Sequence, residues 1–141
     1  MEIIELKTLD ENLVEAMHRL VRQLNPQVEL PESEAIDDII NSDATHLLMV
    51  REDNRWIGSL SLVIYDIPTG RQAKIEDVVV DSAFRGRGIG KALMEEAIRI
   101  ARSKGVKAVS LTSRPSRVAA NQLYINMGFK LHETNVYILS L

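Results

Sequence analysis

The segment with the clearest chemical potential is a glycine-rich turn between a strand-like run and a helix-like run. Three glycines, Gly86, Gly88 and Gly90, occur shortly after the apolar run Val78–Val80. Such a turn exposes backbone N–H groups at the N-terminus of a helix, where unpaired donors and the helix dipole favour an anion. Basic side chains that strengthen this preference flank the glycines; they are Arg85, Arg87 and Lys91. The sequence therefore predicts a phosphate-binding turn.

Two common phosphate-binding motifs do not match this turn. The dinucleotide fingerprint GxGxxG, placed on Gly86 and Gly88, requires a glycine where Lys91 stands. The Walker pattern requires a glycine at Arg85 and a serine or threonine at Ala92. The alternative interpretation is a plain strand-to-helix connection whose glycines serve only positive φ angles.

A second group of candidate residues follows the next strand-like run. Asn121 and Tyr124 are three positions apart, so they project from one face of a helix. A phenol with a pKa near ~10 is protonated at neutral pH and can serve as a general acid. The alternative for a lone helical tyrosine is packing in the core.

Together, these two segments resemble the GNAT superfamily of acyl-CoA-dependent N-acetyltransferases. The pyrophosphate loop of that family has the form R/Q-x-x-G-x-G/A, and a later element often reads N-x-x-Y followed by G-F. The matching residues are Arg85, Gly88 and Gly90 for the first motif and Asn121, Tyr124, Gly128 and Phe129 for the second. By motif the resemblance covers about residues 73 to 133, and the upstream elements match by their order alone.

The resemblance implies an acetyl-CoA site and a role for each matching residue. Tyr124 would stand near the CoA sulfur and donate a proton to the leaving thiolate, and Asn121 would hydrogen-bond the cofactor arm. Backbone groups of Val78 and Val80 would pair with the pantetheine arm as an added strand does, and a strand N–H would help to hold the oxyanion. The residues expected at the cofactor are Val78, Val79, Val80, Arg85, Gly86, Arg87, Gly88, Ile89, Gly90, Lys91, Asn121 and Tyr124.

Two acidic residues inside an apolar strand are the candidates for a general base. An acceptor amine with a pKa near ~10.4 is mostly protonated at neutral pH and must lose a proton before it attacks. Glu76 is expected to share its face of the strand with Val78 and Val80, and an enclosed carboxylate has a raised pKa and is a better base. The similar Ile-Glu-Asp run of amino-sugar-phosphate acetyltransferases makes Glu76 the first candidate and Asp77 the second. The alternative is that both acids are solubilising charges, and a register shift of one residue would exchange their places.

Composition excludes several other kinds of chemistry. The chain has 141 residues and no cysteine, which excludes thiolate nucleophiles, disulfides and Cys-bound metals. Lys plus Arg number 17 and Asp plus Glu 20, a net charge of −3, which argues against general nucleic-acid binding. The three histidines lack metal-ligand spacing, so no metal is expected. Direct acetyl transfer, without a covalent enzyme intermediate, is the expected mechanism.

The apolar periodicity predicts the α/β elements that position these residues. We expect a single domain over residues 1–141, with a GNAT-like mixed, mainly antiparallel twisted sheet flanked by helices. The expected strands are residues 1–7, 46–51, 56–65, 73–81 and 107–112, with a closing hairpin of 129–133 and 136–141. The expected helices carry the apolar residues of Leu13–Leu24, Ile36–Ile40, Leu93–Ala101 and Val118–Met127, with Asp10, Ser33 and Ser116 as caps.

The residues lead to one preferred function and to alternatives. The preferred function is acetyl-CoA-dependent N-acetyl transfer to a primary amine of a small molecule or peptide. A non-catalytic acyl-CoA-binding regulatory module is the alternative from another class of protein. If the chain is an enzyme, an amino-sugar-phosphate acceptor is a competing hypothesis for its substrate. Lining of the site by the acidic stretch Glu29–Asp38 would favour a cationic acceptor, although such runs are usually solvated. No signal peptide or membrane-spanning run is found, so a cytoplasmic protein is expected, and a homodimer is left open.

Overall fold

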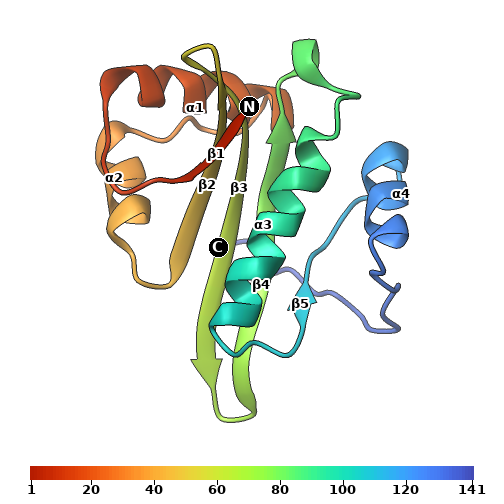
Figure 1. Cartoon of the computed structure of the whole chain (residues 1–141). Coiled ribbons are helices and arrows are strands. Elements are labelled where there is room, and N and C mark those ends of the chain that lie inside the picture. Colours follow the sequence, from red (N-terminus) through yellow and green to blue (C-terminus); the bar gives the residue numbers. More distant parts are fainter. The chain divides into compact units, whose positions relative to one another are not determined.

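The computed structural model describes all residues from 1 to 141, which divide into two compact units, residues 1–111 and 112–141. The first unit contains β1 (Glu2–Glu5), α1 (Glu11–Leu24), α2 (Ser33–Asn41), β2 (Thr45–Glu52), β3 (Arg55–Ile67), β4 (Gly70–Val80), the 3-10 helix η1 (Ser82–Phe84), α3 (Ile89–Ser103) and β5 (Val109–Ser110) (Figure 1). The second unit contains α4 (Val118–Asn126). None of the helices has the length and apolar character needed to span a bilayer.

The first unit is built on one sheet whose five strands lie in the order β1-β2-β3-β4-β5. The first four strands are antiparallel, and β5 runs parallel to β4. A parallel neighbour needs a crossover connection, and α3 is the helix of the crossover between β4 and β5. The expected mixed, mainly antiparallel sheet flanked by helices is confirmed.

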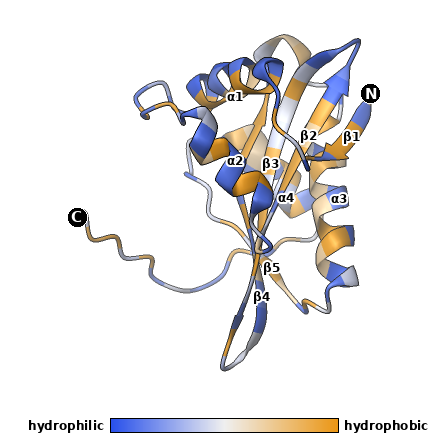
Figure 2. Cartoon of the chain, turned by 90° about the vertical axis from the view of Figure 1, so that its left-hand side faces the viewer, coloured by the Kyte–Doolittle hydropathy of each residue, from blue (hydrophilic) through white to orange (hydrophobic).

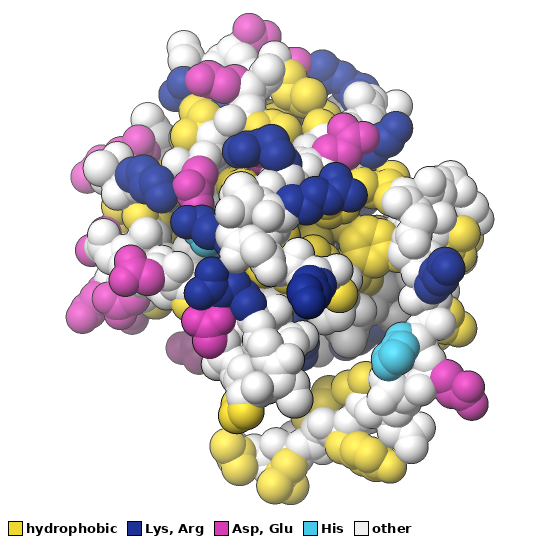
Figure 3. All heavy atoms as spheres, turned by 60° about the horizontal axis from the view of Figure 1, so that its bottom comes forward, with side chains coloured by type: hydrophobic (Ala, Val, Ile, Leu, Met, Phe, Trp, Pro, Cys, Tyr) yellow, Lys and Arg dark blue, Asp and Glu magenta, His cyan; other side chains and the backbone are white.

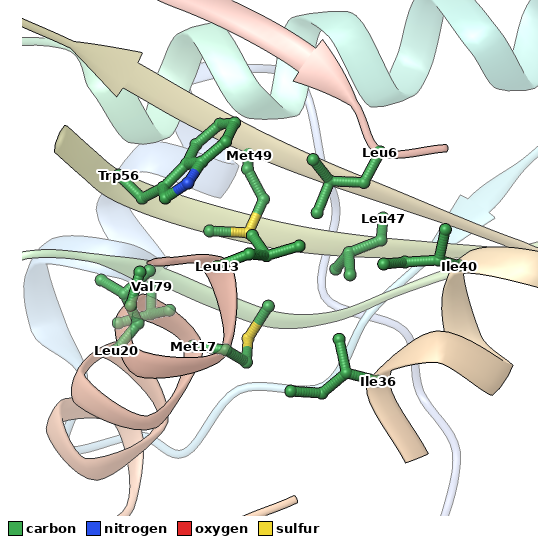
Figure 4. Close-up of a cluster of buried hydrophobic side chains, with 11 residues drawn as sticks. Leu6, Leu13, Met17, Leu20, Ile36, Ile40, Leu47, Met49, Trp56 and Val79 are labelled. Atoms are coloured by element: carbon green, nitrogen blue, oxygen red, sulfur yellow. The ribbon is translucent and has the colours of Figure 1, made fainter. Parts of the chain in front are cut away.

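Helices α1 and α2 cover one face of this sheet. Asp10 begins α1 as expected, because its carboxylate accepts a hydrogen bond of 2.7 Å from the N–H of Leu13. The apolar sides of both helices, orange in Figure 2, pack against side chains of β2, β3 and β4 (Figure 4). The buried helix residues are Leu13, Ala16, Met17, Leu20, Ile36 and Ile40, and the buried strand residues are Leu47, Met49, Trp56 and Val79.

Helix α3 covers the opposite face. Ser59 pairs with Met49 and Val79, which face α1, so its neighbour Gly58 points to the other side of the sheet. A Cβ placed on Gly58 would meet Cγ2 of Ile89 and Cδ1 of Leu93, each 3.4 Å away. The glycine therefore allows the first turns of α3 to lie close to the sheet, beside the end of β4.

Strand β4 contains a β-bulge just before its end. Ser59 pairs with Val79 and Ser61 pairs with Glu76, so three steps along β4 correspond to two steps along β3. Asp77 lies in this irregular stretch with a φ of +51°. An extra residue of this kind bends the strand and re-aims the side chains that precede it.

The bulge corrects the expectation about the face that Glu76 occupies. A regular strand would put Glu76, Val78 and Val80 on one face, but the extra residue puts Glu76 on the face of Val79 and Val80 on the other. Glu76 and Asp77 are both exposed, so the expectation of an enclosed carboxylate is wrong for the chain without substrates.

Three further expectations about local structure differ from the result. Strand β5 has two residues instead of the run 107–112, because only Ala73 and Lys74 of β4 pair with it. The caps expected at Ser33 and Ser116 are also wrong. Helix α2 follows Glu32 and α4 follows Arg117, and neither residue makes a side-chain capping bond.

The last part of the second unit has no regular structure. Residues 127–141 contain no strand, so the expected hairpin of 129–133 and 136–141 is not formed. Thr134 and Asn135 connect these two runs, and neither position holds the glycine that a two-residue hairpin turn favours. The last backbone hydrogen bond runs from the N–H of Phe129 to the carbonyl of Tyr124, at 2.9 Å.

Candidate functional site

The turn between β4 and α3 has the geometry of an anion-binding helix start. Gly86 and Gly88 both have a φ of +79°, and Gly88 is the N-cap of α3 without any side-chain capping bond. The first helical bond runs from the N–H of Ala92 to the carbonyl of Gly88, at 3.0 Å. The N–H groups of the first turn therefore have no helical partner and lie at the positive end of a 15-residue helix.

The two glycines also leave open space beside the backbone. A Cβ on Gly86 or Gly88 would meet no heavy atom within 4 Å, apart from the neighbouring residues. A ligand can therefore approach the backbone donors without displacing a side chain. The positive φ angles and this free space together fit a pyrophosphate, which needs several donors at close range.

Two of the basic side chains around the turn, Arg85 and Lys91, each lie next to an oxygen atom of a nearby residue. Arg85 donates from Nε to the carbonyl of Val80 at 3.0 Å, and Lys91 lies 3.7 Å from a carboxylate oxygen of Glu95. Both cations are exposed. They remain accessible to an anion that approaches the turn.

Arg87 is held more firmly than the other two cations. Its guanidinium donates two hydrogen bonds to the carboxylate of Glu52, at 2.9 and 2.7 Å, and lies 5.6 Å from the ring centre of Phe84. This ion pair lowers the pKa of Glu52 and raises that of Arg87. Basic and acidic side chains are interspersed over the face in Figure 3, so local pairs rather than one large positive field set the electrostatics.

A buried aspartate at the end of β4 connects the turn to the rest of the first unit. Asp81 is 3% exposed and forms an ion pair with Arg19 of α1. It also accepts hydrogen bonds from Arg55 at 3.4 Å and from the N–H of Ala83 at 3.1 Å. Burial alone raises the pKa of Asp81, but the Ala83 and Arg55 hydrogen bonds and the charge of Arg19 outweigh it and hold the pKa below its usual value.

Helix α1 makes two further hydrogen bonds, one to β3 and one to the residue that follows Asp81. Arg19 donates to the carbonyl of Trp56 at 2.6 Å, and Gln23 accepts from the N–H of Ser82 at 2.8 Å. Arg19 and Gln23 are four residues apart, so they lie on one face of α1. Neither Arg19 nor Gln23 is predicted from the sequence as a residue that supports the site. The sequence shows their helical spacing, but it does not show their partners Asp81 and Ser82, which lie 62 and 59 residues further along the chain.

In the second unit, α4 carries Asn121 and Tyr124 as expected. Tyr124 is 6% exposed, and its ring lies 5.9 Å from that of Phe129. Burial raises the pKa of Tyr124, and the charge of Arg117 offsets only part of the rise. The phenol is therefore protonated at neutral pH and is an acid rather than a base.

The stretch before α4 contributes one polar group that lacks a partner. Asn121 donates from Nδ2 to the carbonyl of Arg114 at 2.9 Å, which ties the start of α4 to the preceding turn. The hydroxyl of Ser113 is buried and has no hydrogen-bond partner in the chain. A buried hydroxyl without a partner fits a group that meets a ligand or water.

Comparison with known proteins decides the family. Residues 13–129, which include both motifs, match the acetyltransferase (GNAT) family. The chain belongs to this family. The glucosamine 6-phosphate N-acetyltransferase of Trypanosoma brucei brucei is 34% identical over 137 residues, with 92% of this chain and 91% of that protein covered. Glucosamine 6-phosphate N-acetyltransferase 1 of Oryza sativa subsp. japonica is 29% identical over 119 residues and covers 78% of this chain and 70% of its own length.

Solved structures agree with the GNAT assignment. An acetyltransferase of Trypanosoma brucei is 29% identical, with a TM-score of 0.79 and 99% of both chains covered. An aminoglycoside acetyltransferase from an uncultured soil metagenomic sample has a TM-score of 0.86 over 99% of this chain and 95% of its own, and at 20% identity it shows the fold alone. The chain is an N-acetyltransferase of the GNAT family, whose members use acetyl-CoA as co-substrate and an amine as acceptor.

Proposed function

We propose that the turn from Arg85 to Lys91 binds the pyrophosphate of acetyl-CoA and that the acetyl group passes directly to a primary amine. The observation that carries this proposal is the uncapped start of α3 at Gly88, with open space beside Gly86 and Gly88. Arg85 and Lys91 supply exposed positive charge next to these backbone donors. Ile89 is buried, so it serves through its N–H group and not through its side chain.

The end of β4 is the proposed place for the pantetheine arm. An extended arm pairs with the backbone of Val78–Val80 as an added strand does, and a strand N–H stabilises the oxyanion of the tetrahedral intermediate. The bulge at Asp77 supports this role, because it interrupts the regular β3–β4 ladder next to these residues. Asn121 is proposed to hydrogen-bond the cofactor arm.

In the proposed reaction, a C–N bond replaces the C–S bond of the thioester, and two protons are transferred. The amine nitrogen attacks the thioester carbon, a C–N bond forms, and the C–S bond breaks as the tetrahedral intermediate collapses. Glu76, with Asp77 as second candidate, accepts the amine proton directly or through water. Tyr124 gives its proton to the leaving thiolate, a role that its protonated state at neutral pH supports.

We infer an amino sugar phosphate as the class of acceptor. The two relatives named glucosamine 6-phosphate N-acetyltransferase support this inference, as does the Ile75–Asp77 run in β4. The competing idea of a cationic acceptor beside the acidic stretch loses support, because Glu32, Glu34, Asp37 and Asp38 are all exposed on or next to α2. Such side chains fit a solvated helix face.

A coupled thiol-release assay tests both the reaction and the acceptor. Acetyl-CoA is offered with glucosamine 6-phosphate, glucosamine, spermidine or a lysine peptide, and glucose 6-phosphate is the control without an amine. The chain has no cysteine, so every thiol detected comes from CoA. We expect release with glucosamine 6-phosphate and at least about tenfold lower kcat/KM with glucosamine, because the phosphate supplies binding energy. Tight acetyl-CoA binding without release on any amine would instead support a non-catalytic acyl-CoA-binding module.

A further inference from the structure

Two polar side chains of α1 contact the segment that joins β4 to the glycine-rich turn. Arg19 donates to the carboxylate of Asp81, the residue after β4, and to the carbonyl of Trp56 in β3 at 2.6 Å. Gln23, one helical turn later, accepts a hydrogen bond of 2.8 Å from the N–H of Ser82, the first residue of η1. The apolar side of α1 packs against the sheet (Figure 4), so the helix is itself fixed. Two successive backbone residues are therefore held against a rigid element.

The ion pair between α1 and the end of β4 is largely shielded from water. The side chain of Asp81 is 4% exposed and that of Arg19 is 31% exposed. Loss of one partner from a shielded pair leaves a charge without adequate compensation, so the pair maintains its geometry in the folded chain. Arg22 lies on the same helix but is exposed, and it makes no such contact with β4.

The segment held by α1 leads directly into the turn. Helix η1 is a single turn, in which Asp81 accepts hydrogen bonds from the N–H groups of Ala83 at 3.1 Å and Phe84 at 2.8 Å. Arg85, the first cation of the turn, donates from Nε to the carbonyl of Val80 at 3.0 Å. Each of these bonds ends on one of the two residues at the end of β4. The position of Arg85, and of the N–H groups that follow it, therefore depends on how firmly Asp81 is held.

The rest of the turn has little packing of its own. A Cβ on Gly86 or Gly88 would meet no heavy atom within 4 Å, apart from the neighbouring residues, so side-chain packing does not fix this backbone. A flexible turn must be ordered before several of its N–H groups bind one anion, and this ordering lowers the affinity. The ion pair of Arg87 with Glu52 of β2 anchors the middle of the turn, and the contacts of α1 anchor the segment before it.

We propose that Arg19 and Gln23 are positioning residues for acetyl-CoA, which hold the end of β4 and η1 so that the turn is ordered before the pyrophosphate binds. Both residues act through Asp81 and Ser82, and neither contacts the cofactor. The inference rests on the proposed function of the turn and concerns the binding of acetyl-CoA, not the transfer of the acetyl group. Loss of either contact should weaken binding without slowing the reaction once the cofactor is bound.

Calorimetric titration with acetyl-CoA tests the two residues against a matched control. Arg22→Gln removes an exposed charge from the same helix and should leave the Kd unchanged. We expect the Kd to rise at least about tenfold in Arg19→Gln, and about threefold in Gln23→Leu, which removes one neutral acceptor. Circular dichroism and urea unfolding show which variants are folded at the temperature of the titration. If Arg19→Gln is not folded, Gln23→Leu provides the test.

Kinetics and a double variant separate positioning from a general loss of stability. With the amine that supports thiol release, the KM for acetyl-CoA should rise, whereas kcat at saturating acetyl-CoA should stay within about twofold, because the bound cofactor orders the turn. Combining Arg19→Gln with Asp81→Asn should raise the Kd no further than the larger of the two single effects, since both changes break the same ion pair.

Each possible failure has its own signature. Unchanged acetyl-CoA affinity in a folded variant of Arg19 or Gln23 overturns the role of that residue, and so does a lower kcat with an unchanged KM. Additive losses in the double variant overturn the role of Asp81 as the link to the turn. If Gly88→Ala weakens acetyl-CoA binding and the α1 variants do not, only the positioning role is wrong. If none of these variants weakens binding, the pyrophosphate assignment is wrong as well.

Discussion

At the scale of single residues, Tyr124 has the environment of a proton donor. Its phenol is buried, and burial raises its pKa, so the neutral form is the one that meets a thiolate at neutral pH. We predict that Tyr124→Phe lowers kcat by about 10²-fold to 10⁴-fold if the phenol is the sole acid, with little change in the acetyl-CoA KM. The ring contact with Phe129 remains in this variant, so the fold should persist.

Steady-state and single-turnover kinetics check this prediction. Tyr65→Phe removes a phenol from β3, outside the proposed chemistry, and is the matched control. A Tyr124→Phe single-turnover rate equal to that of the unmodified chain would remove the phenol from the mechanism. The single-turnover measurement is needed because product release often limits kcat.

The two candidate bases can be separated by the pH dependence of their amide variants. If Glu76 accepts the amine proton, Glu76→Gln should lower kcat/KM most at acidic and neutral pH, where most of the acceptor is protonated. The loss should shrink as the pH rises and free amine becomes abundant. Asp77→Asn is the comparison, since asparagine tolerates the φ of +51° at this position. The same deficit in both variants, independent of pH, would contradict a proton-transfer role for Glu76.

Among the structural elements, the turn before α3 depends on a glycine at position 88. Gly105, which follows the end of the same helix, offers a matched comparison. Gly88 at the start of α3 and Gly105 just after its end have φ angles of +79° and +76°, and a Cβ on either would have open space. We predict that Gly88→Ala and Gly105→Ala both lower the free energy of unfolding by about 1 to 2 kcal/mol, because the left-handed region opposes a Cβ. Only Gly88→Ala should weaken acetyl-CoA binding, by about tenfold or more.

Calorimetric titration with acetyl-CoA and denaturant unfolding check these two effects separately. Equal acetyl-CoA affinity in the two alanine variants would show that the glycine at position 88 is needed only for the backbone conformation of the turn and not for binding of acetyl-CoA. The pyrophosphate assignment would then be wrong, because the proposed contact requires close approach to this residue.

The same elements show how far the sequence could predict the structure. The run from Val78 to Lys91 was predicted as strand, turn and helix because apolar periodicity and glycine spacing are local signals. The bulge at Asp77 was not predicted, since no residue type in the strand requires it, and it changes the face of Glu76. The ion pair of Asp81 with Arg19 joins residues that are distant along the chain, and spacing alone carries no information about such pairs. Local motifs therefore predict the proposed site residues. The ion pair that holds the end of β4 in place can be identified only from the fold.

For the whole molecule, ion pairs at several sites make the free energy of unfolding depend on pH. Burial and a hydrogen bond from Ala83 act in opposite senses on Asp81, with a lowered pKa as the net result. The pKa of Glu5 is also lowered, because hydrogen bonds to His46 and Lys7 outweigh burial, and Arg99 lowers that of Glu96. A carboxyl whose pKa is lower in the folded state stabilises that state at pH values above its unfolded pKa, near ~4. This contribution is lost as the pH falls through the folded pKa, so we predict constant stability near neutrality and a decline below about pH 4.5.

Asp81→Asn isolates one of these contributions. The variant keeps the size of the side chain but loses the charge that meets Arg19 and Arg55, so we predict a loss of about 2 kcal/mol in the free energy of unfolding at pH 7. The difference from the unmodified chain should narrow as the pH falls, because the carboxyl of Asp81 then becomes protonated and neutral as well. Asp66→Asn is the matched control, since its ion pair with Arg71 is exposed and should contribute little. Urea unfolding over a series from pH 7 down to about pH 2.5 measures both variants, because a carboxyl with a lowered pKa is protonated in the folded chain only well below the usual value of ~4. A difference for Asp81→Asn that stays constant over this whole range would contradict an electrostatic role for this aspartate.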